Sequence, residues 1–231
     1  MNTQVHDKFR LILLPLAIPE PKHAWYYQRA LHCWEVVWRA FFDQFQGSSK
    51  PFFIDNFLRQ DEAACIFTES ACTALIVFRT VDFSIMDYRN DSWFRIWSDA
   101  DLEMLLQHGK KVFIASHLTV HPDFRRYSVE VKFKEILLDI MVRRFFESSA
   151  NVISGMTRRD RGIHDEAYKL GASMIREDVE FLEGVQADLV VFFRHKVHVS
   201  ESPHVRTLSD ALWTNRVDLG SKPHGQCKPP G

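Results

Sequence analysis

One unit, a strand followed by a turn and a helix, constrains this sequence more than any other feature. Residues 111–121 (KVFIASHLTVH) are rich in β-branched and aromatic side chains, and Gly109 and Pro122 bound them, which is typical of a strand. From residue 126 to residue 149, apolar side chains recur at three- and four-residue steps, which predicts an amphipathic helix. A strand that leads into a helix favours a fold that mixes sheet and helix.

The chain before this unit predicts a long helix and a hairpin. Residues 24–46 carry apolar and aromatic side chains at helical spacing, and a segment rich in Gly, Ser and Pro ends the helix. Residues 63–68 and 72–81 are predicted to be strands. Residues 82–98 show neither period and predict a long loop, which precedes a short helix over residues 99–108.

The chain after this unit alternates again between strand and helix. Three short apolar runs predict strands over residues 152–156, 173–183 and 187–198. Residues 160–170 predict a helix that Gly171 ends. We therefore expect one mixed α/β (α+β) domain over residues 1–214, with helices covering a sheet. Residues 215–231 are rich in Gly, Pro and Lys and predict a disordered tail.

Charge and cysteine usage narrow the classes of partner. The chain of 231 residues carries 29 Lys and Arg against 30 Asp and Glu, so no basic excess predicts binding to nucleic acid. The four cysteines form no Cys-x-x-Cys pair, and we find no signal-peptide pattern, so we expect a reduced, cytoplasmic protein. Charged side chains interrupt the apolar residues 24–46, so we expect no membrane span.

Aromatic residues are abundant, with 19 Phe and 6 Trp. They form either a large aromatic core or the lining of a tunnel for a long hydrocarbon ligand. The wide apolar face of the helix at residues 24–46 either packs deeply or covers such a ligand. We expect it to cover the apolar ligand site.

The junction between the strand and the helix is a candidate anion site. A helix N-terminus leaves about four backbone N–H groups unpaired and carries about half a positive charge. Arg125 and Arg126 lie at this junction and would add planar donors for a phosphate. The alternative is a solvated arginine pair beside Ser128 as the helix N-cap.

These residues resemble a known family. Val-x-Pro-x-x-Arg at Val120, Pro122 and Arg125, followed by the short strand at 152–156 and by Ala-Tyr-Lys-Leu-Gly-Ala at 167–172, is similar to the GCN5-related N-acyltransferases (GNAT). The resemblance implies a mostly antiparallel central sheet flanked by helices. It also implies an N-acyltransferase that uses acyl-CoA or acyl-phosphopantetheine as co-substrate and needs no metal.

The resemblance also assigns the donor site. In this family the strand pairs with the pantetheine arm, and the following loop binds the pyrophosphate. The residues implied in this chain are Leu118, Thr119, Val120, Arg125, Arg126, Tyr127 and Ser128. Ser128 and Glu130 stand where the family has glycines, and Glu130 would repel a diphosphate. Either the donor is a phosphopantetheine on an acyl carrier protein, or the site is degenerate.

The layout is similar to one branch of this family. The long first helix, the long loop at residues 82–98 and the Phe-rich composition resemble the autoinducer synthases and N-acyl amino acid synthases. That resemblance implies a long acyl chain that an acyl carrier protein delivers to a small-molecule amine.

His117 is the candidate base. Strand alternation places His117 and Thr119 on the opposite face from Ser116 and Leu118. In the family the base is often a carboxylate on this strand, and His117 stands near that place. A histidine can accept the proton of the amine directly or through water. The alternative is a histidine that is hydrogen-bonded in the core.

Two further residues are carried over from the family. Tyr168 is the candidate general acid, although the family position coincides with Ala167. Asp160 stands where the family often has an Asn at the start of the last helix, and helix capping is its alternative role. Residues 158–161 (RRDR) predict contact with a phosphate or an acidic carrier protein, or a solvated loop.

The leading hypothesis is therefore an N-acyltransferase with the GNAT fold. The rival hypothesis is a non-catalytic module of the same fold that binds an acyl carrier, a lipid or a protein partner. Turnover of a thioester that depends on an amine distinguishes them.

Overall fold

The computed structural model describes residues 8–46, 52–85, 90–127, 131–182 and 184–220. Its elements follow the chain in this order: β1 (Arg10–Pro15), η2 (Pro21–His23), α1 (Ala24–Gln46), α2 (Asp55–Leu58), β2 (Glu62–Phe67), β3 (Cys72–Asp82), η4 (Ser92–Phe94), α3 (Asp99–Gln107), β4 (Lys111–Val120), η5 (Pro122–Phe124), α4 (Phe133–Glu147), β5 (Val152–Arg158), η6 (Arg159–Arg161), α5 (Ile163–Lys169), β6 (Ser173–Leu182), β7 (Val185–Phe193), α6 (Pro203–Thr214) and β8 (Val217–Asp218).

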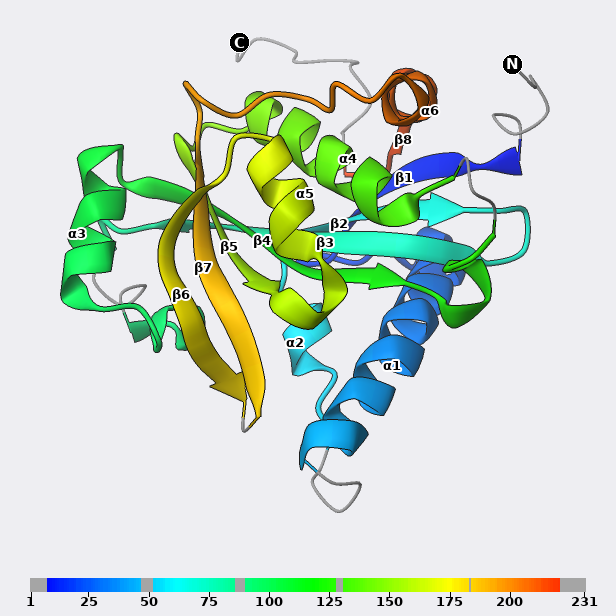
Figure 1. The fold of residues 1–231 in the computed structure, drawn as a ribbon. Helices are drawn as coiled ribbons and strands as arrows, with labels where there is room; N and C mark the ends of the chain where they lie inside the picture. The colour runs from blue at the N-terminus through cyan, green and yellow to red at the C-terminus, as the bar shows by residue number, and fades with distance from the viewer. Residues whose placement is uncertain (1–7, 47–51, 86–89, 128–130, 183, 221–231) are drawn as a thin grey trace, which may run out of the picture.

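The strands form an eight-stranded sheet in the order β6-β7-β5-β4-β3-β2-β1-β8. Neighbouring strands are antiparallel except for the pairs β4–β5 and β1–β8, which are parallel. Helices α4, α5 and α6 lie on one side of the sheet, and α1 and α2 lie on the other (Figure 1). This confirms the predicted mixed, mostly antiparallel sheet flanked by helices, with a long helix near the N-terminus.

Side-chain packing explains these layers. Apolar residues of α4 and α6, such as Ile136 and Leu208, pack with alternate residues of the strands in one buried cluster. On the opposite face, Cys33 and Trp34 of α1 pack against β1, β2 and β3. Each face of the sheet therefore excludes water through a different set of helices.

The sheet opens between β4 and β5. The two strands pair only over Val112–Ile114 and Val152–Ser154. Beyond these residues β4 continues to Val120 and β5 to Arg158 without pairing to each other. The gap lies in the middle of the sheet rather than at its edge.

A bulge in β4 accompanies this gap. Ser116 lies opposite Val77 and Thr119 lies opposite Leu75, so β4 has one more residue here than β3. His117 adopts a positive φ of 51°, which is uncommon for a residue with a side chain. An extra residue of this kind bends a strand and interrupts its pairing.

The bulge changes the predicted alternation. Leu118 packs on the α4 side, whereas the ring of His117 contacts Trp34 and Trp38 of α1, as strand alternation predicts. Ser116 pairs with Val77, which packs against α1, so Ser116 lies on the same face as His117. The prediction was wrong for Ser116 because two successive residues of a bulge leave the period of two.

Helix α4 begins at Phe133 rather than at residue 126. The 3-10 turn η5 follows β4, and Lys132 has non-helical backbone angles (φ −102°, ψ 82°). The rings of Phe124 and Phe133 meet edge to face with centroids 6.3 Å apart. Apolar spacing predicted an earlier helix start because Val131 also faces the core, although from the loop before α4.

Between residues 203 and 220 the structure differs from the prediction. Residues 203–214 form α6, for which we predicted no element, and its Val205, Leu208 and Leu212 are buried. Val217 and Asp218 form β8 beside β1, and the Leu219 N–H donates to the Leu13 carbonyl (3.0 Å). Backbone hydrogen bonds at a strand edge need few apolar side chains, so composition suggested disorder. Residues 221–231 lie outside the described residues.

Candidate functional site

A cavity of about 610 Å³ lies where β4 and β5 diverge. Its walls come from the C-terminal half of α1, the ends of β4 and β5, the loop after β4, and the first turn of α4. The lining residues are Val37, Trp38, Ala40, Phe41, Gln44, His117, Leu118, Val120, Phe124, Arg125, Val131, Lys132, Phe133, Lys134, Glu135, Met156, Arg158, Arg161 and Ile163. A volume of this size is typical of small-molecule sites.

One wall of the cavity is apolar and aromatic. Trp38 and Phe41 of α1 face Met156 of β5 across the opening between the strands, and Phe124 and Phe133 line it from the α4 side. Trp34, by contrast, is fully buried against the sheet. The wide face of α1 therefore covers both the sheet and the cavity.

The other part of the lining is cationic. Arg125, Arg158 and Arg161 line the cavity together with Lys132 and Lys134. Burial and the nearby charge of Arg161 lower the pKa of Arg125 from its ordinary value. An added anion near both guanidinium groups would relieve this repulsion, although Arg161 already pairs with Asp160 (3.3 Å).

The N-terminus of α4 borders the same place. Residues Lys132 to Glu135 line the cavity, and Lys132, the N-cap, provides no side-chain cap. The first N–H groups of this helix and its positive dipole end add to the arginine charges. The predicted coincidence of Arg125 with a helix N-terminus is present, although the helix begins at Phe133.

His117 lies at the wall of the cavity next to α1. Its ring contacts Trp38 edge to face (centroids 4.7 Å apart), and its Nδ1 lies 3.1 Å from the Ser116 hydroxyl. Burial, together with the charge of Arg59, lowers the pKa of His117 to about 3. The imidazole is therefore neutral at physiological pH and a weak base.

Thr119 connects α1 to the bulge. The Trp38 indole N–H donates to the Thr119 hydroxyl (3.0 Å), which in turn donates to the His117 carbonyl (2.6 Å). The Thr119 side chain is fully buried. Its side chain thus holds the wall of the cavity in place instead of facing the opening.

By sequence, no family model matches the chain, and no curated protein matches it. Solved structures do match its fold. FeeM, an N-acyl amino acid synthase from uncultured soil microbes, superposes with a TM-score of 0.56 at 12% identity, over 81% of this chain and 92% of that one. BjaI, a CoA-dependent acyl-homoserine lactone synthase solved with SAM and isopentyl-CoA, gives 0.57 at 8% identity, over 93% and 95%. The acyl-homoserine lactone synthase LasI gives 0.52 at 10% identity, over 90% and 96%.

The chain has the GNAT fold. The expected resemblance, including its autoinducer and N-acyl amino acid synthase branch, is thereby confirmed for the fold. Within the described ranges, no helix is long and apolar enough to cross a membrane. Over the same part of the chain, no group of three or more His, Cys, Asp or Glu side chains is placed to hold a metal ion.

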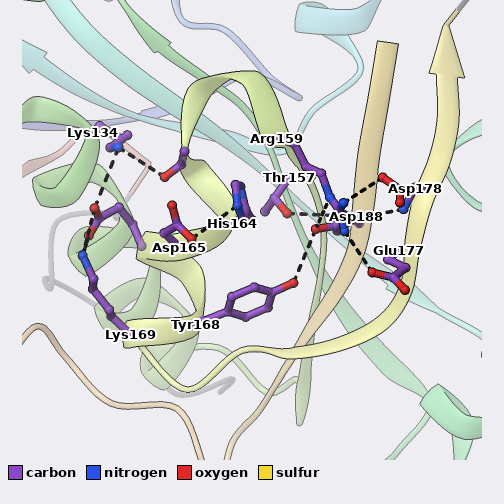
Figure 2. A network of polar contacts seen from close by, with 12 residues as sticks. Lys134, Thr157, Arg159, His164, Asp165, Tyr168, Lys169, Glu177, Asp178 and Asp188 are labelled. Atoms are coloured by element: carbon purple, nitrogen blue, oxygen red, sulfur yellow. Dashed lines mark hydrogen bonds and ion pairs between the residues drawn. The ribbon is translucent and has the colours of Figure 1, made fainter. Parts of the chain in front are cut away.

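Tyr168, the acid carried over from the GNAT resemblance, is not among the residues that line the cavity. Its hydroxyl points to Asp188 and donates to the Asp188 Oδ2 (3.5 Å; Figure 2). Burial and the charge of Asp188 raise the pKa of Tyr168. The structure therefore does not bring Tyr168 together with His117, because α5 turns this side chain towards β7.

Asp188 is the buried centre of a polar network that extends to the surface. Its carboxylate is 1% exposed and accepts from Arg159 Nε (2.9 Å) and from the Asp178 backbone N–H (3.1 Å). Arg159 also pairs with Glu177 (3.1 Å) and Asp178 (2.9 Å) on β6 (Figure 2). The network fixes η6, from which Arg161 reaches the cavity.

Three of the remaining site predictions fall elsewhere. Asp160 lies in η6, where it accepts from Arg158 (2.6 Å), and Gly162 rather than Asp160 is the N-cap of α5, so Asp160 caps no helix there. Arg126 is exposed outside the cavity, and the Tyr127 ring packs against Phe9 with centroids 5.5 Å apart. Arg126 and Tyr127 lie away from the cavity because α4 begins only at Phe133. Ser128 lies outside the described residues.

Several lining residues were not among the predicted site residues. Phe41 and Met156 showed only the apolar spacing of core positions, which does not reveal an opening in a sheet. The guanidinium of Arg158 lies 4.1 Å from the centre of the Phe41 ring, a cation–π contact between β5 and α1. The cluster RRDR at residues 158–161 was the one sequence signal for Arg158 and Arg161.

Proposed function

We propose that this protein is an N-acyltransferase that moves an acyl group from a pantetheine thioester to a small-molecule amine. The observation that carries the proposal is the cavity between the diverging strands β4 and β5, which is apolar along α1 and cationic at the start of α4. FeeM and BjaI, which share the fold, support it with the synthase activities in their names.

In the proposed reaction the free amine attacks the thioester carbonyl carbon. A C–N bond forms and the C–S bond breaks. The nitrogen loses one proton, and the departing thiolate gains one, so that an amide and a thiol result. Holding the two reactants in contact contributes most of the rate, since an oriented pair avoids the entropy of encounter.

The donor would lie along β4 with its ends in two different environments. Its phosphate groups would meet Arg125, Arg161 and the N-terminus of α4. Its acyl chain would lie against Trp38 and Phe41, an apolar wall that suits a long chain. BjaI is named as CoA-dependent, which supports acyl-CoA as donor, and an acyl carrier protein is the second donor to test.

His117 would accept a hydrogen bond from the amine but would not keep the proton that the amine loses. With a pKa of about 3, its neutral ring accepts a hydrogen bond but holds a proton weakly at neutral pH. The attacking amine would then be the fraction already deprotonated, and the proton would pass to water. Amine acylation should therefore accelerate as pH approaches the pKa of the amine.

The test measures thiol release from acetyl-CoA, dodecanoyl-CoA and dodecanoyl acyl carrier protein, with and without a mixture of primary amines. We expect release from at least one long-chain donor only when amine is present. Arg125→Gln should raise the KM for that donor by about 10–100-fold, the value of a charge-assisted contact. Arg206→Gln, a change at an exposed residue of α6, should not.

The opposite result separates the two hypotheses. If every donor binds, as a shift in Tm shows, but none is turned over with any amine, the protein is a carrier-binding module and the proposal is wrong. If neither binding nor turnover occurs, the proposal is wrong, and the module hypothesis stands only for a lipid or a protein partner.

A further inference from the structure

Ser116 directly precedes His117, and the two side chains form a hydrogen-bonded pair. In a regular strand, consecutive side chains point to opposite faces and do not meet. The bulge in β4 changes this arrangement. Ser116 lies opposite Val77, which packs against α1. The His117 ring lies on this same face, next to Trp38 of α1, so the Ser116 Oγ comes within 3.1 Å of the His117 Nδ1.

Ser116 does not itself face the cavity. It is buried, and it is not among the residues that line the cavity, whereas His117 is. Within the described part of the chain, the Ser116 hydroxyl has no hydrogen-bond partner besides the His117 ring. Any effect of this hydroxyl on a reaction in the cavity therefore passes through His117.

Three contacts fix the orientation of the His117 ring. Trp34 and Trp38 meet it edge to face, with centroids 5.7 Å and 4.7 Å away, and Ser116 contacts its Nδ1. Among the described residues, the other ring nitrogen, Nε2, has no hydrogen-bond partner. Nε2 is therefore the nitrogen that remains for a molecule in the cavity.

The hydrogen bond with Ser116 is linked to the position of the ring proton. A neutral imidazole has one N–H donor and one acceptor nitrogen, and the hydrogen bond at one nitrogen decides which is which. If Nδ1 carries the proton, it donates to the Ser116 hydroxyl, and the Nε2 lone pair can accept from an amine. If Nε2 carries the proton, the Ser116 hydroxyl donates to Nδ1, and Nε2 cannot accept.

We infer that Ser116 is a positioning residue, which accepts a hydrogen bond from the His117 Nδ1–H and so directs the Nε2 lone pair at the attacking amine. This rests on the proposed function, in which His117 accepts a hydrogen bond from the amine. A neutral hydrogen bond of this kind shifts an equilibrium by up to about 10-fold. Loss of the Ser116 hydroxyl should therefore lower the fraction of His117 in the accepting tautomer, while the two tryptophans still hold the ring in the cavity wall.

NMR of protein with isotope-labelled histidine measures the tautomer, because the chemical shift of a ring nitrogen depends on whether it carries a proton. The spectrum of His117→Gln assigns the His117 signals. At neutral pH, wild-type protein should carry the His117 proton on Nδ1. Ser116→Ala should lower that fraction, and Ser116→Thr, which keeps a hydroxyl, should preserve it. Ser154→Ala is the matched control and should not change it, since Ser154 is a buried serine of β5 whose hydroxyl accepts from the Trp93 indole N–H (2.9 Å) and which does not line the cavity.

Kinetics test the consequence for the reaction. Ser116→Ala should lower kcat by about 3–10-fold and leave the KM for dodecanoyl-CoA unchanged. Ser116→Thr should recover most of the rate, and Ser154→Ala should match wild type. In a His117→Gln background, Ser116→Ala should have no further effect on kcat, because the hydroxyl acts only through that ring. A residue that merely stabilises the fold would lower the rate in both backgrounds.

The tautomer and the rate separate the two proposals. A His117 proton on Nε2 in wild type, an unchanged tautomer in Ser116→Ala, or an equal loss of kcat in both backgrounds overturns the inference. If Ser116→Ala changes the tautomer but wild type turns over no donor with any amine, the proposed function fails, and Ser116 remains the residue that orients His117. If amine-dependent turnover occurs but is the same in Ser116→Ala, the proposed function stands and the inference fails.

Discussion

The pKa of His117 links the bulge in β4 to the stability of the protein. The folded protein holds this ring with a pKa of about 3, whereas an unfolded histidine titrates near 6.5. Between these values the unfolded chain binds a proton that the folded chain does not, so stability falls as pH decreases. Above about pH 6.5 the ring contributes nothing to this dependence.

We therefore predict that in His117→Gln the unfolding free energy depends less on pH between pH 6.5 and 3 than it does in wild-type protein. Wild-type protein should lose up to about 1.4 kcal/mol of unfolding free energy per pH unit from this residue between pH 6.5 and 3. Urea unfolding at pH 7, 6, 5 and 4 measures it. His204→Gln, a change at an exposed residue of α6, serves as the control. Parallel curves for wild type and His117→Gln would contradict the low pKa.

At the residue level, sequence reasoning identified part of the candidate site. Arg125, which the strand-to-helix junction singled out, lines the cavity, as do Leu118 and Val120, which the GNAT resemblance implied. Tyr168 could not be assigned, because the direction of a helical side chain depends on how α5 rotates against β7.

Helix α1 packs on the sheet along one part of its length and borders the cavity along another. Its middle packs on the sheet through Trp34, and its C-terminal half borders the cavity through Trp38 and Phe41. The spacing of apolar residues predicted the helix but not this division. The opening of the sheet beneath one half of the helix depends on β4 and β5, which lie far along the chain.

Shortening Phe41 should change the preferred acyl chain. Phe41→Leu removes part of the apolar wall and part of the cation–π contact with Arg158, so longer chains should be favoured over dodecanoyl. We expect a stability cost of about 1 kcal/mol. Phe145→Leu, a change at a fully buried ring of α4 outside the cavity, should cost a similar amount and leave chain preference unchanged. Rates with a series of acyl-CoA lengths measure the effect.

The network around Asp188 joins η6 and α5 to β6 and β7. Asp188→Asn leaves Arg159 without its buried charged partner, so we expect a loss of about 1–3 kcal/mol of unfolding free energy. Because Arg161 lies in the same turn, the KM for the donor should also rise. Asp210→Asn, a change at an exposed partner of Arg143, is the matched control. If the variant is destabilised but its KM for the donor is unchanged, the network stabilises the fold and does not contribute to donor binding.

The whole molecule is almost neutral, with a formal net charge of −1, yet five cationic side chains and one carboxylate, Glu135, are among the described residues that line the cavity. Donor binding should therefore weaken with salt although the overall charge is slightly negative, because the local charges are screened. Titration of CoA at 0.05 M and 0.5 M KCl should show the weaker affinity at high salt. Affinity that does not change with salt would place the phosphates away from these cations.

Sequence reasoning predicted most of the architecture at this scale. The alternation of helices and strands predicted the layered sheet, because each apolar face needs a covering partner. It did not predict the two strands at one end of the sheet order, β1 and β8. The run Leu-Ile-Leu-Leu at residues 11–14 is a signal for β1, whereas β8 is too short for any periodicity.

The extra residue in β4 has a consequence for how this chain tolerates length changes. Substitutions do not change the number of residues between Ser116 and Thr119, so β4 still has one residue more than β3 here and still bends. Deleting a single residue here would let β4 run straight against β3, while Thr119 and Val120 would keep their partners on β3 and their faces, because Ser116 and His117 share one face. The opening is thus encoded by a residue count, and a one-residue deletion would remove it even where every remaining side chain is unchanged.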